Sequence, residues 1–96
     1  MEGNGRNETD KIEVSLSNHG TVNKNSVQIR KGNQSVTLYF SYQTIVAVGG
    51  VVSVNDWDNT TGKFLNELCP DKEERVPHTQ VLAEAQKRLK RVLGGE

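Results

Sequence analysis

Residues 39–66 read YFSYQTIVAVGGVVSVNDWDNTTGKFLN, and this stretch decides the fold. It holds both Phe residues, both Tyr residues and the only Trp of the chain. Two β-branched runs, residues 44–48 and 51–54, flank Gly49-Gly50, which predicts two strands joined by a tight hairpin turn. Because these runs are apolar at consecutive positions, we expect both of their faces to be covered, either in the middle of the sheet or against helices.

Three further strands are predicted on the N-terminal side of this stretch. Apolar and polar residues alternate within residues 12–17, 26–30 and 36–41, which is the pattern of half-buried strands. Residues 18–20 and 31–34 supply turn residues, and residues 41–43 leave room only for a tight turn or a bulge. These features favour an antiparallel meander with one packed face and one wet face.

Helices are predicted on the C-terminal side. Asn59 or Thr60 can cap the N-terminus of a helix of about two turns, which Pro70 ends. After Pro77, apolar residues recur at spacings of three and four within residues 81–93, as in an amphipathic helix of roughly four turns. Gly94-Gly95 then ends this second helix.

The predicted architecture is α+β: an antiparallel β-meander of about five strands, then a short helix and a longer C-terminal amphipathic helix packed on the sheet. It forms a single domain over residues 11–94, and residues 1–10, which are polar and rich in Gly and Asn, predict a disordered tail. Only 33% of the chain is apolar, so its core must be thin, and a ligand or self-association could add to its stability.

Charge and cysteine usage narrow the function. Twelve basic and twelve acidic residues give a net charge of zero, which argues against a dedicated nucleic-acid-binding protein. Cys69 is the only cysteine, so an intramolecular disulfide is excluded. The chain shows no apolar leader and no apolar run of membrane length, and we therefore expect a cytoplasmic protein that does not enter a membrane.

No arrangement of reactive residues predicts catalysis, a metal site or a cofactor. His19, His78 and Cys69 lack the spacing of a zinc site. Asp56 and Asp58 lack the further spaced ligands of a calcium loop. Cys69 with His78 would need an orienting group and an oxyanion hole that no motif supplies. We expect a protein that is not an enzyme.

The segment Thr60-Thr61-Gly62-Lys63 stands at a predicted helix start. Free N–H groups, hydroxyls and a lysine at such a place would suit an anion. Ordinary N-capping with a solvated lysine explains the same residues, and we favour that interpretation. The segment is no P-loop, because Trp57 and Phe64 stand where that pattern needs Gly and Ser or Thr.

Aromatic residues beside this segment extend it to a possible binding corner. Trp57 could stack on a base or fill a partner's pocket, but we favour a Trp57 that folds back to close the core. Tyr39 and Ser41 could line a polar groove, although Tyr39 on a solvent face would also serve cross-strand packing. The predicted binding corner consists of Tyr42, Gln43, Trp57, Thr60, Thr61 and Lys63.

The end of the last predicted helix is basic. Lys87, Arg88, Lys90 and Arg91 could contact a phosphate backbone. Cations near a helix C-terminus also complement the helix dipole and keep an exposed face soluble, which is the interpretation we favour.

The segments FSYQTIVAV, W, TTGKFLN and RVPHTQVLAEAQKRL resemble a group of small uncharacterised proteins of phages, plasmids and related mobile elements. The resemblance covers roughly residues 38–93. It rests on Phe40, Ser41, Tyr42, Thr44, Val46, Ala47, Trp57, Thr60, Thr61, Lys63 and Asn66. Where members of the group often carry His, this chain has Phe64. The resemblance implies an accessory protein of a mobile element, in a host cell, and no particular activity.

The leading hypothesis is a small binding protein that contacts a host protein, a nucleic acid or a nucleotide through the predicted corner. A second hypothesis is a structural protein whose exposed β-edges are completed in a symmetric homodimer. A third is a DNA- or RNA-binding protein that uses the basic end of its last helix, with an affinity that falls steeply with salt.

Overall fold

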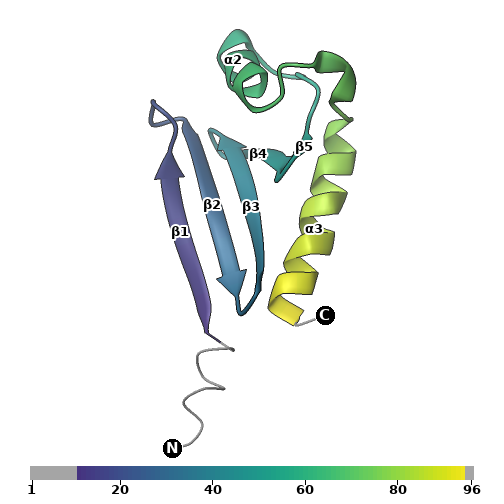
Figure 1. Cartoon of the computed structure of the whole chain (residues 1–96). Helices are drawn as coiled ribbons and strands as arrows, with labels where there is room; N and C mark the ends of the chain where they lie inside the picture. Colours follow the sequence, from purple (N-terminus) through teal and green to yellow (C-terminus); the bar gives the residue numbers. More distant parts are fainter. Residues whose placement is uncertain (1–10, 95–96) are drawn as a thin grey trace, which may run out of the picture.

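The computed structural model describes residues 11–94, so the predicted tail and Gly95 lie outside the described residues. The strands are β1 (Ile12–Asn18), β2 (Lys24–Lys31), β3 (Gln34–Ser41), β4 (Thr44–Val48) and β5 (Val51–Val52). They are followed by α2 (Asn59–Leu68), a short 3-10 helix η1 (Lys72–Glu74) and α3 (His78–Gly94). This order confirms the predicted α+β architecture, which Figure 1 shows as one twisted sheet with both helices against it.

The five strands form one sheet in the order β1-β2-β3-β4-β5, and every neighbouring pair is antiparallel. The predicted meander is therefore confirmed. Gly32 and Gly49 have positive φ values of 62° and 56°, which is the backbone conformation that tight hairpin turns require. Tyr42, in the tight turn between β3 and β4, also has a positive φ of 57°.

A β-bulge in β4 explains why consecutive apolar residues are buried there. Tyr39 pairs with Ala47, but Phe40 pairs with Ile45, so Val46 is an extra residue without a partner on β3. Val46, Ala47 and Val48 are all fully buried. Such a bulge lets two successive side chains turn toward the same face, which a regular strand does not allow. The prediction that this strand is covered on both faces is confirmed.

Helix α3 covers one face of the sheet. Its residues Val81, Ala85 and Val92 pack on Val36 and Leu38 of β3, and Val48 of β4 joins the same cluster. Alternate residues of β3 supply these contacts, as the predicted half-buried strand requires. The apolar residues that recur at spacings of three and four in the sequence therefore form the face of α3 that packs on the sheet.

Helix α2 covers part of the opposite face. Phe64 and Leu65 pack on Val46 and Ala47 of β4, and Val52 of β5 completes the cluster, with Tyr39, Leu68 and Cys69 packed around it. The sequence analysis expected Tyr39 and Ser41 on a solvent-facing surface, but Tyr39 is partly buried against the α2 cluster and Ser41 is buried. Tyr39 lies with its ring centroid 6.4 Å from that of Phe64, and Ser41 is 3% exposed.

Of the two placements expected for the second apolar run, the structure has the one against helices, since β5 is an edge strand whose Val52 packs in the α2 cluster and whose Val51 packs in the α3 cluster. β5 ends at Val52, short of the predicted residue 54, and Ser53 forms only an isolated bridge to Val76. The other edge strand corrects a prediction. β1 is not half-buried, because all seven of its residues are exposed. A helix is about 10 Å wide and strands lie about 4.8 Å apart, so one helix covers about two strands. α3 lies against β3 and β4, which leaves β1 bare.

Candidate functional site

The start of α2 is organised by Asp58 rather than by Asn59 or Thr60, which corrects the predicted cap. The Asp58 carboxylate accepts a hydrogen bond of 2.9 Å from the Thr61 backbone N–H. Asn55 supports this turn, since its Oδ1 accepts from the Trp57 N–H and its Nδ2 donates to the Asp58 carbonyl. Asp58 can take this role because its short side chain reaches back to a first-turn donor.

The same hydrogen bonds change the ionisation of Asp58. The backbone N–H and the side chain of Thr61 donate to the carboxylate and hold the pKa of Asp58 below its ordinary value of 3.8. A carboxylate therefore already occupies the positive end of the α2 dipole. An external anion at this helix start would meet that negative charge, so the Thr60–Lys63 segment is a capped helix start.

Thr61 ties α2 to the sheet. Its hydroxyl lies 2.8 Å from that of Ser41 at the end of β3, and both residues are 3% exposed. Thr61 is thus a buried structural residue and not part of an accessible corner. Burial of two hydroxyl groups is tolerated here because each is the partner of the other.

The sequence analysis favoured a Trp57 that folds back to close the core, and the structure shows that it does not. It is 37% exposed and packs edge-on against His78, with the ring centroids 4.9 Å apart. His78 in turn lies with Nε2 2.9 Å from the Ile45 carbonyl oxygen of β4. Trp57 therefore links the loop before α2 to the start of α3 while keeping one side in contact with solvent.

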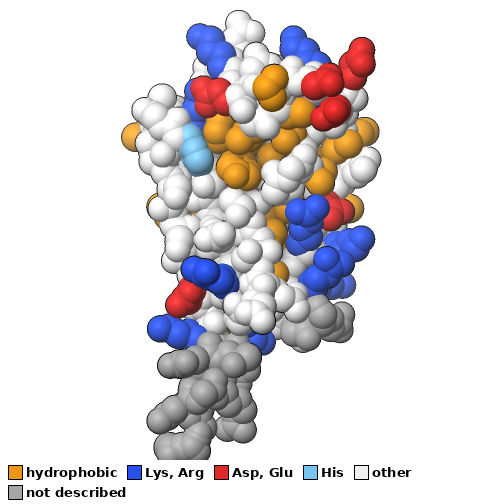
Figure 2. Space-filling model, in the orientation of Figure 1, with side chains coloured by type: hydrophobic (Ala, Val, Ile, Leu, Met, Phe, Trp, Pro, Cys, Tyr) orange, Lys and Arg blue, Asp and Glu red, His pale blue; other side chains and the backbone are white. Residues whose placement is uncertain are grey.

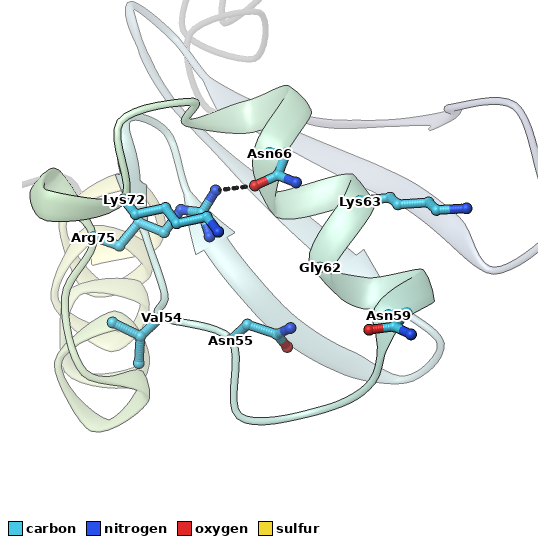
Figure 3. Close-up of a pocket in the computed structure, with 8 residues that line it drawn as sticks. All are labelled: Val54, Asn55, Asn59, Gly62, Lys63, Asn66, Lys72 and Arg75. Atoms are coloured by element: carbon cyan, nitrogen blue, oxygen red, sulfur yellow. Dashed lines mark hydrogen bonds between the residues drawn. The ribbon is translucent and has the colours of Figure 1, made fainter.

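An open hollow of about 490 Å³ lies between α2, the chain after β5 and the turn that contains η1 (Figure 3). Three of its side chains are cationic and three are asparagine amides. Its lining consists of Val54, Asn55, Asn59, Gly62, Lys63, Asn66, Lys72 and Arg75. No carboxylate belongs to this lining, although Asp71, Glu73 and Glu74 are close in sequence.

Arg75 is held in the hollow by three hydrogen bonds. Its Nε and one terminal nitrogen donate to the Cys69 carbonyl oxygen, at 3.1 and 2.8 Å, and that nitrogen also donates to Asn66 Oδ1 at 2.6 Å. These bonds satisfy the C-terminal end of α2 and fix the plane of the guanidinium. Figure 3 shows Lys72 beside Arg75, whereas Lys63 points away from them on the other side of α2.

Gly62 allows the Asn55 side chain, one wall of the hollow, to lie directly against the backbone of α2. A Cβ at this position would lie 2.8 Å from Asn55 Nδ2, so the bare backbone of α2 lets the Asn55 amide lie against the helix. The glycine in Thr60-Thr61-Gly62-Lys63 thus serves a close approach rather than a phosphate loop.

The six residues of the predicted corner do not line one site. Tyr42 and Gln43 line a separate shallow hollow with Val22, Asn23 and Thr44. Of the six, only Lys63 lines the hollow beside α2. Sequence reasoning missed Asn55, Asn59, Asn66, Lys72 and Arg75, which gather only because the turn after α2 folds back on it.

The four cationic residues near the end of α3 have different surroundings in the structure, since one forms an ion pair and three line an exposed surface. Arg88 is paired with Glu84 at 2.7 Å, and hydrogen bonding to Arg88 holds the pKa of Glu84 below its ordinary value. Lys87, Lys90 and Arg91 line a polar surface on the outer side of α3 with Ala83 and Gln86. One of the four charges is thus neutralised within the helix.

A serine and a histidine that the sequence analysis did not pair lie together on β2 and the preceding loop. His19 Nε2 is 2.8 Å from Ser26 Oγ, and the His19 ring packs on Tyr39 and Phe64. Within residues 11–94, no carboxylate hydrogen-bonds to His19, and neither His19 nor Ser26 lines the hollow beside α2, the hollow at Tyr42 or the polar surface of α3. The pair is best explained as packing of a polar ring at the edge of the α2 cluster.

The surface around α2 is mixed in character. Figure 2 shows hydrophobic side chains gathered below α2, with lysines, arginines and acidic side chains around them. Among the described residues, no three His, Cys, Asp or Glu side chains come close enough to hold a metal ion. None of the helices in residues 11–94 is long and apolar enough to cross a membrane.

Comparison with known proteins gives one match. Residues 11–84 match a family of unknown function, DUF8033. No curated protein and no solved structure matches the chain significantly. The matched segment contains every strand, α2 and the beginning of α3, and it spans well over half of the chain. The protein therefore belongs to the family of unknown function DUF8033.

Proposed function

We propose that this protein is a non-enzymatic binding protein whose α2 hollow receives an anionic group of a partner, either a phosphate or a carboxylate. The observation that carries the proposal is the lining of that hollow. Lys72 and Arg75 supply adjacent positive charges, Lys63 adds a third charge from the other side of α2, and three asparagine side chains supply further donors. A hollow without a carboxylate in its lining attracts oxyanions, because charge-assisted hydrogen bonds to them are the strongest available.

The guanidinium of Arg75 is prepared for this role. Its bonds to the Cys69 carbonyl and to Asn66 hold it in place before any ligand binds. A fixed donor loses less side-chain entropy on binding than a free one. Lys72 stands beside it, so an oxyanion at this point would meet two positive charges from the same turn.

The Asp58 carboxylate, which is hydrogen-bonded to the Thr61 N–H, supports the α2 hollow rather than the N-terminus of α2 as the anion site. It satisfies the Thr61 N–H and places a negative charge at the tip of α2. An anionic partner is therefore directed to the side of the helix, where Asn66 and Arg75 lie. A role as an accessory protein of a mobile element, which the sequence resemblance implies, is consistent with such a binding module and is part of this proposal.

The proposal is tested by titrating ¹⁵N-labelled protein with inorganic phosphate, and separately with acetate, at constant ionic strength. We expect amide shifts concentrated in residues 55–66 and 72–75, with dissociation constants in the millimolar range. A larger response to phosphate would point to a nucleotide or nucleic-acid source, and a larger response to acetate to a protein carboxylate.

The variant Lys63→Ala/Lys72→Ala removes two of the three cations without touching the bonds of Arg75. We expect it to lose most of the phosphate and acetate response. Lys87→Ala/Lys90→Ala on the outer side of α3 removes the same charge elsewhere and is the matched control. An equal loss in both variants, or shifts confined to α3, would overturn the proposed site.

A further inference from the structure

β1 is an open sheet edge, and it differs from the opposite edge. At the other side of the sheet, β5 is only two residues long, and its continuation is bonded to Val76, since the Val76 N–H donates to Val52 and the Val54 N–H donates to Val76. β1 is seven residues long and contains neither Pro nor Gly. Among residues 11–94, Figure 1 shows no other element on its outer side. Natural edge strands are normally shortened, bulged, charged or covered. Within residues 11–94, β1 is neither short nor bulged nor covered, and Glu13 is its one charged residue.

The apolar side chains of β1 extend the face that α3 covers. Val14 lies opposite Ile29, and Leu16 lies opposite Val27, so these residues share one face of the sheet. Val27 and Ile29 in turn lie opposite Leu38 and Val36, which α3 buries. The exposed fractions of Ile12, Val14 and Leu16 are 49%, 65% and 72%. The apolar face therefore continues past the helix to the edge.

The free backbone groups belong to the same three residues. The His19 N–H donates to the Lys24 carbonyl, which marks a hydrogen-bonded pair of the β1–β2 ladder. Hydrogen-bonded and non-hydrogen-bonded pairs alternate along an antiparallel ladder. Glu13, Ser15 and Ser17 thus bond to β2, whereas the N–H and C=O groups of Ile12, Val14 and Leu16 point outward to the open edge.

We propose that a second copy of this chain pairs with β1 through its own β1, antiparallel, about a two-fold axis at Val14. In this register Val14 lies opposite the partner's Val14, and Ile12 lies opposite the partner's Leu16. Each of these pairs exchanges both backbone hydrogen bonds, because the outward groups of the two strands coincide. The result is one continuous sheet through both copies, with an isologous interface.

The side chains of β1 favour the register centred on Val14 over the registers shifted by one residue in either direction. On the other face, Glu13 lies opposite the partner's Ser15, and Glu13 keeps its ion pair with Arg30, at 3.4 Å. A shift that centres the axis on Glu13 would place two carboxylates opposite each other, which destabilises a sheet. A shift that centres it on Ser15 would leave Ile12 opposite the polar Asn18 of the other copy. Only the register at Val14 pairs every apolar residue with an apolar residue.

This interface lies on the opposite side of the sheet from β5 and uses none of the residues of the α2 hollow, so it stands independently of the proposed anion binding. Its small area predicts a weak dimer, with a dissociation constant in the micromolar range. Sedimentation velocity between about 1 µM and 1 mM would measure it. Val14→Lys, which places two cations at the axis, is expected to raise the dissociation constant at least tenfold.

Val22→Lys is the matched control for that experiment. Val22 is 85% exposed in the loop after β1, so the same substitution there leaves the dissociation constant unchanged. Circular dichroism melts of both variants are expected to match the parent, because both side chains already face solvent. A monomer throughout the concentration range, or an equal effect of the two substitutions, would overturn the proposal.

The register is tested by Val14→Cys in a Cys69→Ser background. Residues of a hydrogen-bonded antiparallel pair have Cα atoms about 5.5 Å apart, which lies within the range that a disulfide spans. Mild oxidation is expected to give a disulfide-linked dimer with Val14→Cys and little with Val22→Cys. Equal cross-linking at the two positions would refute the two-fold axis at Val14.

Discussion

Ser41 Oγ and Thr61 Oγ1 lie 2.8 Å apart, and this buried pair joins the end of β3 to the first turn of α2. Both partners are enclosed, so neither hydroxyl can exchange its partner for water. The pair therefore fixes where α2 meets the sheet, and with it the position of the hollow that α2 borders.

The first prediction concerns this pair. Thr61→Val keeps the shape of the side chain but leaves the Ser41 hydroxyl without its partner, which should cost about 1–3 kcal/mol of unfolding free energy. Ser41→Ala should also destabilise the protein, and the double variant should lose less than the sum of both losses. Urea denaturation of the four proteins measures this coupling. Strictly additive losses would show that the two hydroxyls do not stabilise each other.

The second prediction concerns the pH dependence of Asp58. The pKa of Asp58 is lowered in the folded protein, so its contribution to stability is present above the unfolded value of about 3.8 and is lost as pH falls through the folded pKa. Asp58→Asn keeps an oxygen acceptor for the Thr61 N–H but cannot titrate. Thermal melts should therefore separate the two proteins at neutral pH and bring them together as the pH falls below 3.8 and through the folded pKa of Asp58.

A matched control for that experiment is Asp56→Asn, two residues away in the same loop. The Asp56 side chain makes no hydrogen bond within residues 11–94, so its replacement should leave the pH profile of the parent unchanged. If Asp56→Asn altered the acid limb as strongly as Asp58→Asn, general charge rather than the cap would be responsible.

The third prediction compares two aromatic residues. Phe64 is 1% exposed and packs on Tyr39, His19 and the β4 cluster, so Phe64→Ala should cost about 3–5 kcal/mol. Trp57→Ala removes a larger ring but should cost only about 1 kcal/mol, because the ring is 37% exposed and makes one edge contact with His78. Urea denaturation followed by circular dichroism tests this order. Equal losses would mean that Trp57 is part of the core.

The fourth prediction concerns Gly62. Replacing an interior helical glycine by alanine normally gains roughly 1 kcal/mol, but the new methyl group would displace the Asn55 amide from α2. The two effects oppose each other, so Gly62→Ala should change the unfolding free energy by less than about 1 kcal/mol. The phosphate response should nevertheless weaken, because Asn55 forms one wall of the hollow. Unchanged phosphate shifts in a folded variant would show that this wall does not contact the ligand.

Local chemistry was enough to predict the strands and helices. Alternation marks β2 and β3, positive-φ glycines mark the turns at Gly32 and Gly49, and the spacing of apolar residues marks α3. Each of these signals lies within a few residues of the element that it predicts. The five-stranded sheet agrees with them, whereas the origin of the protein, its lack of catalysis and its cytoplasmic location stay predictions.

Apart from the N-cap of α2, where Asp58 takes the place expected of Asn59 or Thr60, the errors depend on contacts between distant segments. β1 shows the alternation of a half-buried strand, but its burial depends on how far α3 reaches across the sheet. Tyr39 was expected on a wet face because nothing in residues 34–41 announces that α2 folds over it. The hollow depends on Arg75 meeting Asn66 across the turn after α2, and no motif encodes such a meeting.

The bare strand β1 also determines how the folded chain opens. Val46, Ala47 and Val48 lie between both helix clusters, so their amide hydrogens should exchange with deuterium only when the whole domain unfolds. Glu13, Ser15 and Ser17 are bonded to β2 alone, and all of them are exposed, so their amides should exchange through fraying of one strand. The protein thus has a slowly exchanging centre and a rapidly exchanging rim, and any chain that pairs with β1 would slow exchange first in that rim.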